Sequence, residues 1–192
     1  MKTVQELPSG YSEKLVIDLQ KNKKEAIVVN GLAVIVMAVM YYVRQIKEPF
    51  VDWLDRTVRD GGIVWALLII GVGTVVYVIL HEFTHGVAMK ISGGMRVKYG
   101  FTGLYAYAGS EKDYFPKWRY IFIALAPVVL WGIIFAVLET AFPALGWSIY
   151  FLQMINVSGA AGDLYVTCRM LMMPGSVLVM DTGVNMTVFD KD

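Results

Sequence analysis

The sequence predicts an all-α membrane protein with four transmembrane helices and short β-hairpins in the second loop and the C-terminal tail. Hydrophobic residues make up 57% of the 192 residues and charged residues only 17%, whereas soluble domains carry about 45–50% and about 25%. Four uncharged apolar stretches are long enough to cross a bilayer. The net charge of +1 argues against a nucleic-acid partner, and the single cysteine excludes an intrachain disulfide.

Each predicted span is a run of about 20 mostly apolar residues, the length that a helix needs to cross the hydrocarbon core. A buried core helix would explain any one run, but four runs in one short chain favour a membrane. The first run follows 25 residues of mixed polar sequence, so we expect a retained helix rather than a cleaved signal peptide. We expect the chain to form one membrane-embedded domain, residues 1–192, with helices at about 26–43, 63–85, 120–140 and 144–163 and a tail at 170–192.

The distribution of lysine and arginine predicts the orientation of these helices. The N-terminal segment, the second loop and the tail together carry thirteen of these residues, and the first loop carries four. We therefore expect both termini and the second loop on the cytosolic side, most simply of the plasma membrane. The first loop, residues 49–60, reads either as an amphipathic helix on the outer surface or as a solvated connector.

Two later segments read as hairpins. In residues 97–109, apolar and aromatic residues alternate in part around a turn at Thr102-Gly103. Such a strand edge could bind an extended substrate by strand addition, or the segment could be an ordinary interfacial hairpin with Tyr99, Tyr105 and Tyr107 at the headgroup level. Residues 176–189 suggest a second hairpin that turns at Asp181-Thr182-Gly183.

The strongest chemical signal is His81-Glu82-Phe83-Thr84-His85, which continues the second apolar helix. Residues four apart lie on one helical face, so the two imidazoles can hold one Zn²⁺ at about 2.0–2.1 Å. Glu82 stands beside them and can take a proton from a zinc-bound water without being a ligand. The alternative is a pair of ordinary histidines at a helix end.

A third ligand must come from another helix, and depth selects it. His81 lies 18 residues after the predicted start of its helix, and Asp163 lies 16 to 19 residues after the start of the fourth helix, so both reach about the same level. Glu139 lies at the opposite end of the third helix, out of reach. We therefore predict Asp163 as the third ligand, although a solvated acid at a helix end is the alternative.

Two further residues lie within the predicted helices. Asn156 shares a face with Asp163 and could bind a substrate carbonyl or oxyanion, or could make a structural interhelical hydrogen bond. Pro127 lies inside the third helix, where it removes a backbone donor and frees a carbonyl, and membrane helices tolerate such prolines.

An H-E-x-x-H that closes one membrane helix, with an aspartate late in another, resembles the site-2 protease group of intramembrane zinc proteases. It is more closely similar to the small four-helix family called the putative zincin peptidase domain, from about residue 12 to the tail. The resemblance implies His81, His85 and Asp163 as zinc ligands and Glu82 as general base. The sequence from Asn156 to Leu164 departs from the N-P…D-G pattern of site-2 proteases, because no proline follows Asn156 and no glycine follows Asp163.

The leading hypothesis is therefore a membrane-embedded zinc metalloprotease that cleaves a membrane protein or membrane-boundary peptide near the cytosolic face. The alternative is a non-catalytic metal-binding membrane protein, such as a scaffold, sensor or transporter-like protein. Glu82 discriminates between them, because an unreactive site has no need of a carboxylate that is not a ligand. The expected partners are a membrane-protein or peptide substrate and the lipid bilayer, and not nucleic acid, while the oligomeric state stays open.

Overall fold

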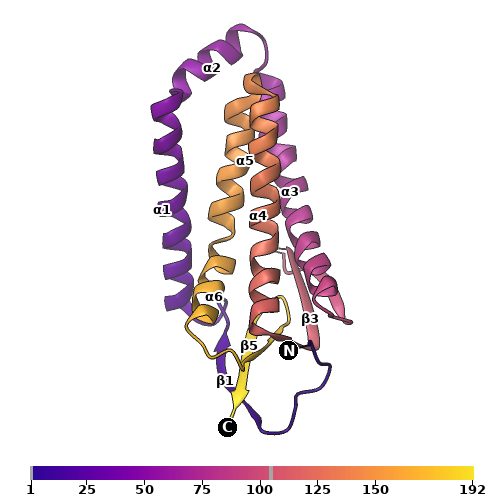
Figure 1. Ribbon diagram of the computed structural model, residues 1–192. Coiled ribbons are helices and arrows are strands. Elements are labelled where there is room, and N and C mark those ends of the chain that lie inside the picture. Colours follow the sequence, from indigo (N-terminus) through magenta and orange to yellow (C-terminus); the bar gives the residue numbers. More distant parts are fainter. Residues whose placement is uncertain (1, 104–105) are drawn as a thin grey trace. The chain divides into compact units, whose positions relative to one another are not determined.

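The computed structural model describes residues 2–103 and 106–192, which form two compact units. Unit 1 comprises Met1–Val28, Leu80–Pro127 and Gly162–Asp192, and unit 2 comprises Val29–Ile79 and Val128–Ala161. The elements of both units are shown along the chain in Figure 1.

Three helices of the described residues are long and apolar enough to cross a membrane: α1 (Lys23–Lys47), α3 (Ile63–Ile91) and α4 (Lys117–Ala141). They confirm three of the predicted helices, each extended by up to six residues at an end. Helix α1 follows Asn22, whose side-chain oxygen accepts a hydrogen bond from the Glu25 amide at 3.3 Å, so a polar cap sets its start.

The fourth predicted span, 144–163, is not one continuous helix. After a short 3-10 turn, η1 (Pro143–Leu145), the chain forms α5 (Gly146–Gly159), breaks at Ala160 and resumes as α6 (Ala161–Leu171). The break follows Gly159, and glycine is a poor helix former. The neighbouring Ser158 hydroxyl donates to the Met154 carbonyl at 2.7 Å, a contact that often bends a helix. The break places Asp163 in the first turn of α6 rather than late in a long helix. Four spans are therefore not established.

The β-structure is not a pair of separate short hairpins, as the sequence predicted, but one sheet. Unit 1 contains a five-stranded antiparallel sheet of order β1-β5-β4-β3-β2 among the described residues. Both predicted hairpins are present in it, but β3 continues past the first hairpin and pairs with β4, Phe115 opposite Val179. The sequence did not predict β1. The strands are β1 (Tyr11–Ile17), β2 (Val97–Phe101), β3 (Ala106–Pro116), β4 (Leu178–Asp181) and β5 (Met186–Lys191).

The core of unit 1 lies between this sheet and the adjoining ends of α3, α4 and α6. The strands contribute Phe115, Val179 and Val188, which are fully buried, and the helices contribute Met89 and Met170. Gly109 lets β3 approach the β4–β5 turn, because a Cβ atom there would overlap the backbone of Thr182. The sheet is thus held against the helix segment that carries the histidines.

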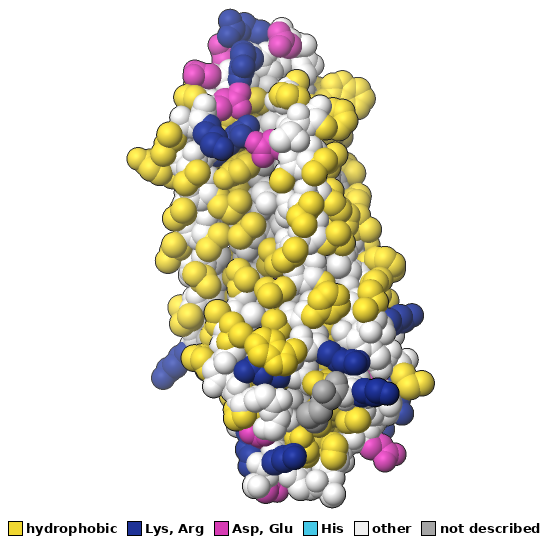
Figure 2. Space-filling model, viewed as in Figure 1, with side chains coloured by type: hydrophobic (Ala, Val, Ile, Leu, Met, Phe, Trp, Pro, Cys, Tyr) yellow, Lys and Arg dark blue, Asp and Glu magenta, His cyan; other side chains and the backbone are white. Residues whose placement is uncertain are grey.

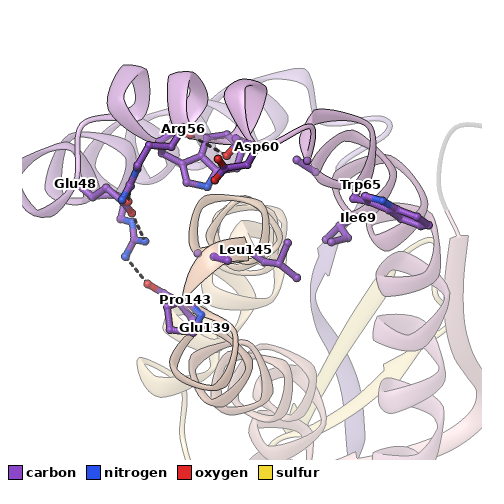
Figure 3. Close-up of a pocket in the computed structure, with 15 residues that line it drawn as sticks. Glu48, Arg56, Asp60, Trp65, Ile69, Glu139, Pro143 and Leu145 are labelled. Atoms are coloured by element: carbon purple, nitrogen blue, oxygen red, sulfur yellow. Dashed lines mark hydrogen bonds and ion pairs between the residues drawn. The ribbon is translucent and has the colours of Figure 1, made fainter.

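A cluster of ion pairs links helices within unit 2. Arg44 of α1 donates to Glu139 of α4 and, at 3.1 Å, to Glu48, while Arg56 of α2 (Phe50–Arg59) also pairs with Glu48. A cavity of ≈ 840 Å³ adjoins this cluster, with Glu48, Arg56, Asp60 and Glu139 on its wall (Figure 3). Residues 49–60 thus include a helix, as one of the two predicted alternatives required, and Trp53 anchors it with only 4% of its surface exposed.

Large apolar side chains are exposed along the three long helices. Figure 2 shows them over the visible face, while charged side chains lie around α2 at the top of the view and also in its lower part. On α3 alone, Trp65 is 68% exposed, Val75 62% and Ile79 60%. Such continuous apolar surface marks contact with another apolar phase, so the structure supports membrane association.

Candidate metal centre

His81, Glu82 and His85 lie in the C-terminal half of helix α3, which continues to Ile91, and all three belong to unit 1. The helical spacing places the two imidazoles side by side, with their ring centroids 4.9 Å apart. Each histidine is only 9% exposed. The next residue, Gly86, leaves room for the ring of Tyr99 from β2, because a Cβ atom at Gly86 would overlap that ring. The hairpin therefore lies directly against the motif.

Asp163 joins the two histidines from the first turn of α6. Its Oδ2 atom lies 3.4 Å from Nε2 of His81, and its Oδ1 atom lies 3.4 Å from Nε2 of His85. Candidate ligand atoms of these three residues all lie within 4.8 Å of one another. The carboxylate thus offers one oxygen to each imidazole, and the structure brings together the three residues that the sequence singled out.

The geometry of this group fits a tetrahedral zinc site. With zinc–ligand bonds of about 2.0–2.1 Å, two ligands at the corners of a tetrahedron are about 3.3–3.4 Å apart. Each imidazole nitrogen lies 3.4 Å from an Asp163 oxygen, although from a different oxygen in each case, so this edge length is met for each histidine separately. Two imidazole nitrogens and one carboxylate oxygen also leave the fourth position open, as in catalytic zinc sites. The donor set and its spacing therefore match the metal that the motif implies.

A backbone contact orients His85. Its Nδ1 atom lies 3.0 Å from the carbonyl oxygen of Ile123 on α4. A carbonyl can only accept, so Nδ1 carries the proton and donates it. In the neutral imidazole, Nε2 then presents its lone pair toward Asp163, which can also only accept. This pair is satisfied either by a proton on Nε2, which then donates to the carboxylate, or by a metal ion that Nε2 ligates.

Glu82 lies beside the group and is held by the sheet. Its Oε2 atom accepts a hydrogen bond from the backbone amide of Ala108 on β3 at 2.8 Å. The sequence did not indicate this contact, because 26 residues separate the two partners. One carboxylate oxygen is thereby anchored, and the side chain is positioned next to the imidazoles without belonging to the three-residue group.

A partly buried pair of side chains next to this group was not predicted from the sequence. Tyr120 of α4 donates to Oδ2 of Asp181 at 2.5 Å, and the Gly183 amide donates to Oδ1 at 2.7 Å. Burial raises the pKa of the Asp181 carboxyl above its usual value, and these two hydrogen bonds oppose the rise. The only signal in the sequence was the Asp181-Thr182-Gly183 turn, which is confirmed as the β4–β5 connection.

Replacing Tyr120 by phenylalanine should destabilise the protein in a pH-dependent way. A hydrogen bond to an ionised group contributes about 1.5–3 kcal/mol, and one between neutral groups about 0.5–1.5 kcal/mol. When the pKa of a carboxyl is raised by folding, the free energy of unfolding decreases as pH rises through that pKa. Loss of the Tyr120 hydroxyl raises the pKa of Asp181 further, so this decrease becomes larger. The loss of unfolding free energy should therefore be larger at pH 7 than in acid. Tyr42→Phe, at an exposed tyrosine, is the control; an equal loss at both pH values would contradict the prediction.

Other predicted residues have different surroundings. Asn156 belongs to unit 2, is fully buried, accepts from the Tyr77 hydroxyl at 2.9 Å and donates to the Val128 carbonyl at 3.1 Å. These contacts favour its structural alternative over an oxyanion role. Glu139, expected away from the site, pairs with Arg44. The first hairpin is confirmed by the pairing of β2 with β3, while Tyr105 lies outside the described residues.

Comparisons with known proteins find a family model and a curated protein that are similar to this chain. A model of the family described as "Putative zincin peptidase" matches residues 74–178, a range that contains all four residues of the centre. An uncharacterized 24.7 kDa protein in the gap 5' region of Pyrococcus woesei is 31% identical over 114 residues, which cover 57% of the chain and 49% of that protein. The chain thus spans about half the length of this curated relative. No solved structure matches the chain.

Proposed function

Because the chain belongs to the family described as Putative zincin peptidase, we propose that it is a membrane zinc metallopeptidase in which His81, His85 and Asp163 hold the metal. We propose Glu82 as the general base, and a resemblance in mechanism to site-2 proteases. Family membership supports a metallopeptidase, and the three apolar helices support membrane association. The identity of the zinc ligands, the class of substrate and the cleavage within the membrane are proposed here.

One observation carries the assignment of the ligands. Asp163 is 78 residues beyond His85, yet its two oxygens each lie 3.4 Å from an imidazole nitrogen. Nearly buried imidazoles beside a carboxylate need a compensating positive charge, which a proton on an imidazole or a bound metal ion can supply.

The residues around the group have defined tasks in peptide hydrolysis. Zinc, when bound, supplies a Lewis acid that polarises a carbonyl and lowers the pKa of water to about 7. Glu82 accepts a proton from the attacking water, whose oxygen bonds to the peptide carbon. As the carbon–nitrogen bond breaks, Glu82 passes that proton to the leaving amine. The Ala108 amide holds Glu82 in place for both transfers.

The substrate is proposed to be a membrane protein or a peptide at the membrane boundary. Strand β2 lies at the edge of the sheet, and its outer edge pairs with no other strand among the described residues. An extended peptide could add to this edge, and Tyr99 of β2 lies against Gly86, one residue beyond His85. The strand-addition alternative therefore has an available edge close to the centre.

The proposed orientation places both termini and the metal centre on the cytosolic side, most simply of the plasma membrane. Its support is the excess of lysine and arginine in the N-terminal segment, the second loop and the tail. Water must reach a hydrolytic site, and the motif lies in the C-terminal half of α3, toward the end that this orientation places on the cytosolic side.

Removing the metal tests the proposed function directly. Purified protein should contain about one zinc per chain, as expected for one three-ligand site. A comparison of membrane-protein fragments between cells with and without the protein would supply a substrate. Dialysis against a chelator should abolish its cleavage in proteoliposomes, and added Zn²⁺ should restore it. Undiminished cleavage by metal-free protein would contradict a zinc peptidase.

A further inference from the structure

The carbonyl that binds His85 belongs to a particular position in α4. Ile123 lies four residues before Pro127, and both residues are buried inside the helix. In an α-helix, the carbonyl of residue 123 accepts from the amide of residue 127. Proline has no amide hydrogen, so Pro127 leaves the Ile123 carbonyl without this partner. Nδ1 of His85 lies 3.0 Å from that oxygen.

The proline also affects the direction of this carbonyl. A proline ring inside a helix crowds the carbonyl four residues earlier and pushes it away from the helix axis. A buried carbonyl that has lost its helical partner must find another donor, because leaving it unpaired is costly. Ile123 is only 1% exposed, so bulk water does not reach it. The imidazole of His85 supplies the donor.

We propose that Pro127 is a positioning residue for the metal centre: it reserves the Ile123 carbonyl for His85 and thereby holds Nε2 of His85 as a lone-pair donor toward the ligand group. This inference rests on the proposed function, because it assumes that His85 binds zinc. Partners that hold the second nitrogen of a ligand histidine typically contribute about 10–100-fold to metal affinity. Here the partner is a backbone carbonyl, which no side-chain substitution at Ile123 can remove.

Substitution of Pro127 distinguishes a positioning role from a role in helix stability, because it should weaken zinc binding while it makes helix α4 more stable. Alanine or glycine restores the amide at position 127, which then competes with His85 for the Ile123 carbonyl. Both residues are better helix formers than proline, and alanine is better than glycine. A role limited to helix structure would therefore leave zinc affinity unchanged or make it follow helix stability. A positioning role weakens zinc binding in both variants although their helices are more regular.

The experiment compares wild type, Pro127→Ala, Pro127→Gly and the control Pro143→Ala in detergent micelles. Pro143 starts η1 in unit 2, where a missing amide costs nothing. Zinc affinity is measured by competition with a chromogenic chelator, and ¹⁵N spectra of zinc-free protein report which nitrogen of His85 carries the proton. We expect about 10–100-fold weaker binding in both Pro127 variants, a loss of the Nδ1-protonated signature, and no change in the control.

Three results would overturn the positioning role of Pro127, and a fourth would overturn the proposed function. Wild-type affinity in both Pro127 variants would overturn the positioning role, and so would losses that differ between alanine and glycine in the order of their helix stability. Unchanged ¹⁵N spectra accompanied by weaker binding would also overturn it, because the loss would then have another origin. If wild-type protein binds no zinc, the proposed function fails instead, and the ¹⁵N spectra still test whether Pro127 directs the His85 hydrogen bond.

Discussion

Replacement of Glu82 by glutamine is expected to abolish peptide cleavage while zinc remains bound. Glutamine keeps an oxygen that can accept from the Ala108 amide, so the side chain should stay in place. It cannot take a proton from water, and loss of a general base typically lowers kcat by about 10²–10⁴-fold. Zinc content by metal analysis and cleavage in proteoliposomes are measured on the same preparation.

Glu111→Gln is the matched control for this substitution. Glu111 also lies on β3 of unit 1, but its side chain is 59% exposed and pairs with Lys98. The control should retain full activity. If Glu82→Gln cleaved as well as wild type, Glu82 would not be the base. If wild type bound zinc without cleaving any membrane protein, the non-catalytic metal-binding alternative would replace the peptidase.

Replacement of Asp163 by alanine should remove most of the zinc. The substitution deletes the oxygens that lie 3.4 Å from each imidazole and leaves only two ligands. Losing a residue that merely supports a ligand costs about 10–100-fold in affinity, so losing a ligand should cost more than that. Equilibrium dialysis followed by metal analysis gives the occupancy, and His81→Ala should reproduce the loss.

Asp55→Ala provides the comparison for the aspartate. Asp55 lies on α2 in unit 2 with its side chain 64% exposed, so its removal should leave the zinc content unchanged. Full zinc occupancy in Asp163→Ala would show that the third ligand lies elsewhere. Loss of zinc from Asp163→Ala with a native circular dichroism spectrum would exclude general unfolding as the cause.

The predictions that the structure confirms depend on patterns among residues that are close together in the sequence. The long apolar runs defined α1, α3 and α4 because lipid selects for length and hydrophobicity within one segment. The spacing of His81 and His85 placed them on one helical face for the same local reason. Asp163 was selected by counting residues along two helices, and it lies beside the histidines although the helix that the count assumed is broken at Ala160; its role as a ligand stays a prediction.

The sequence by itself determined that apolar surface exceeds what a soluble domain carries, and it marked the two histidines, Glu82 and Asp163 as one group. Only the tertiary structure decided that the two hairpins and β1 form one sheet, and that Ala108 holds Glu82. The same holds for the contact between His85 and the carbonyl that Pro127 leaves free. These features depend on backbone groups that every residue possesses, so their pairing follows from which segments pack together and not from the type of residue at each position.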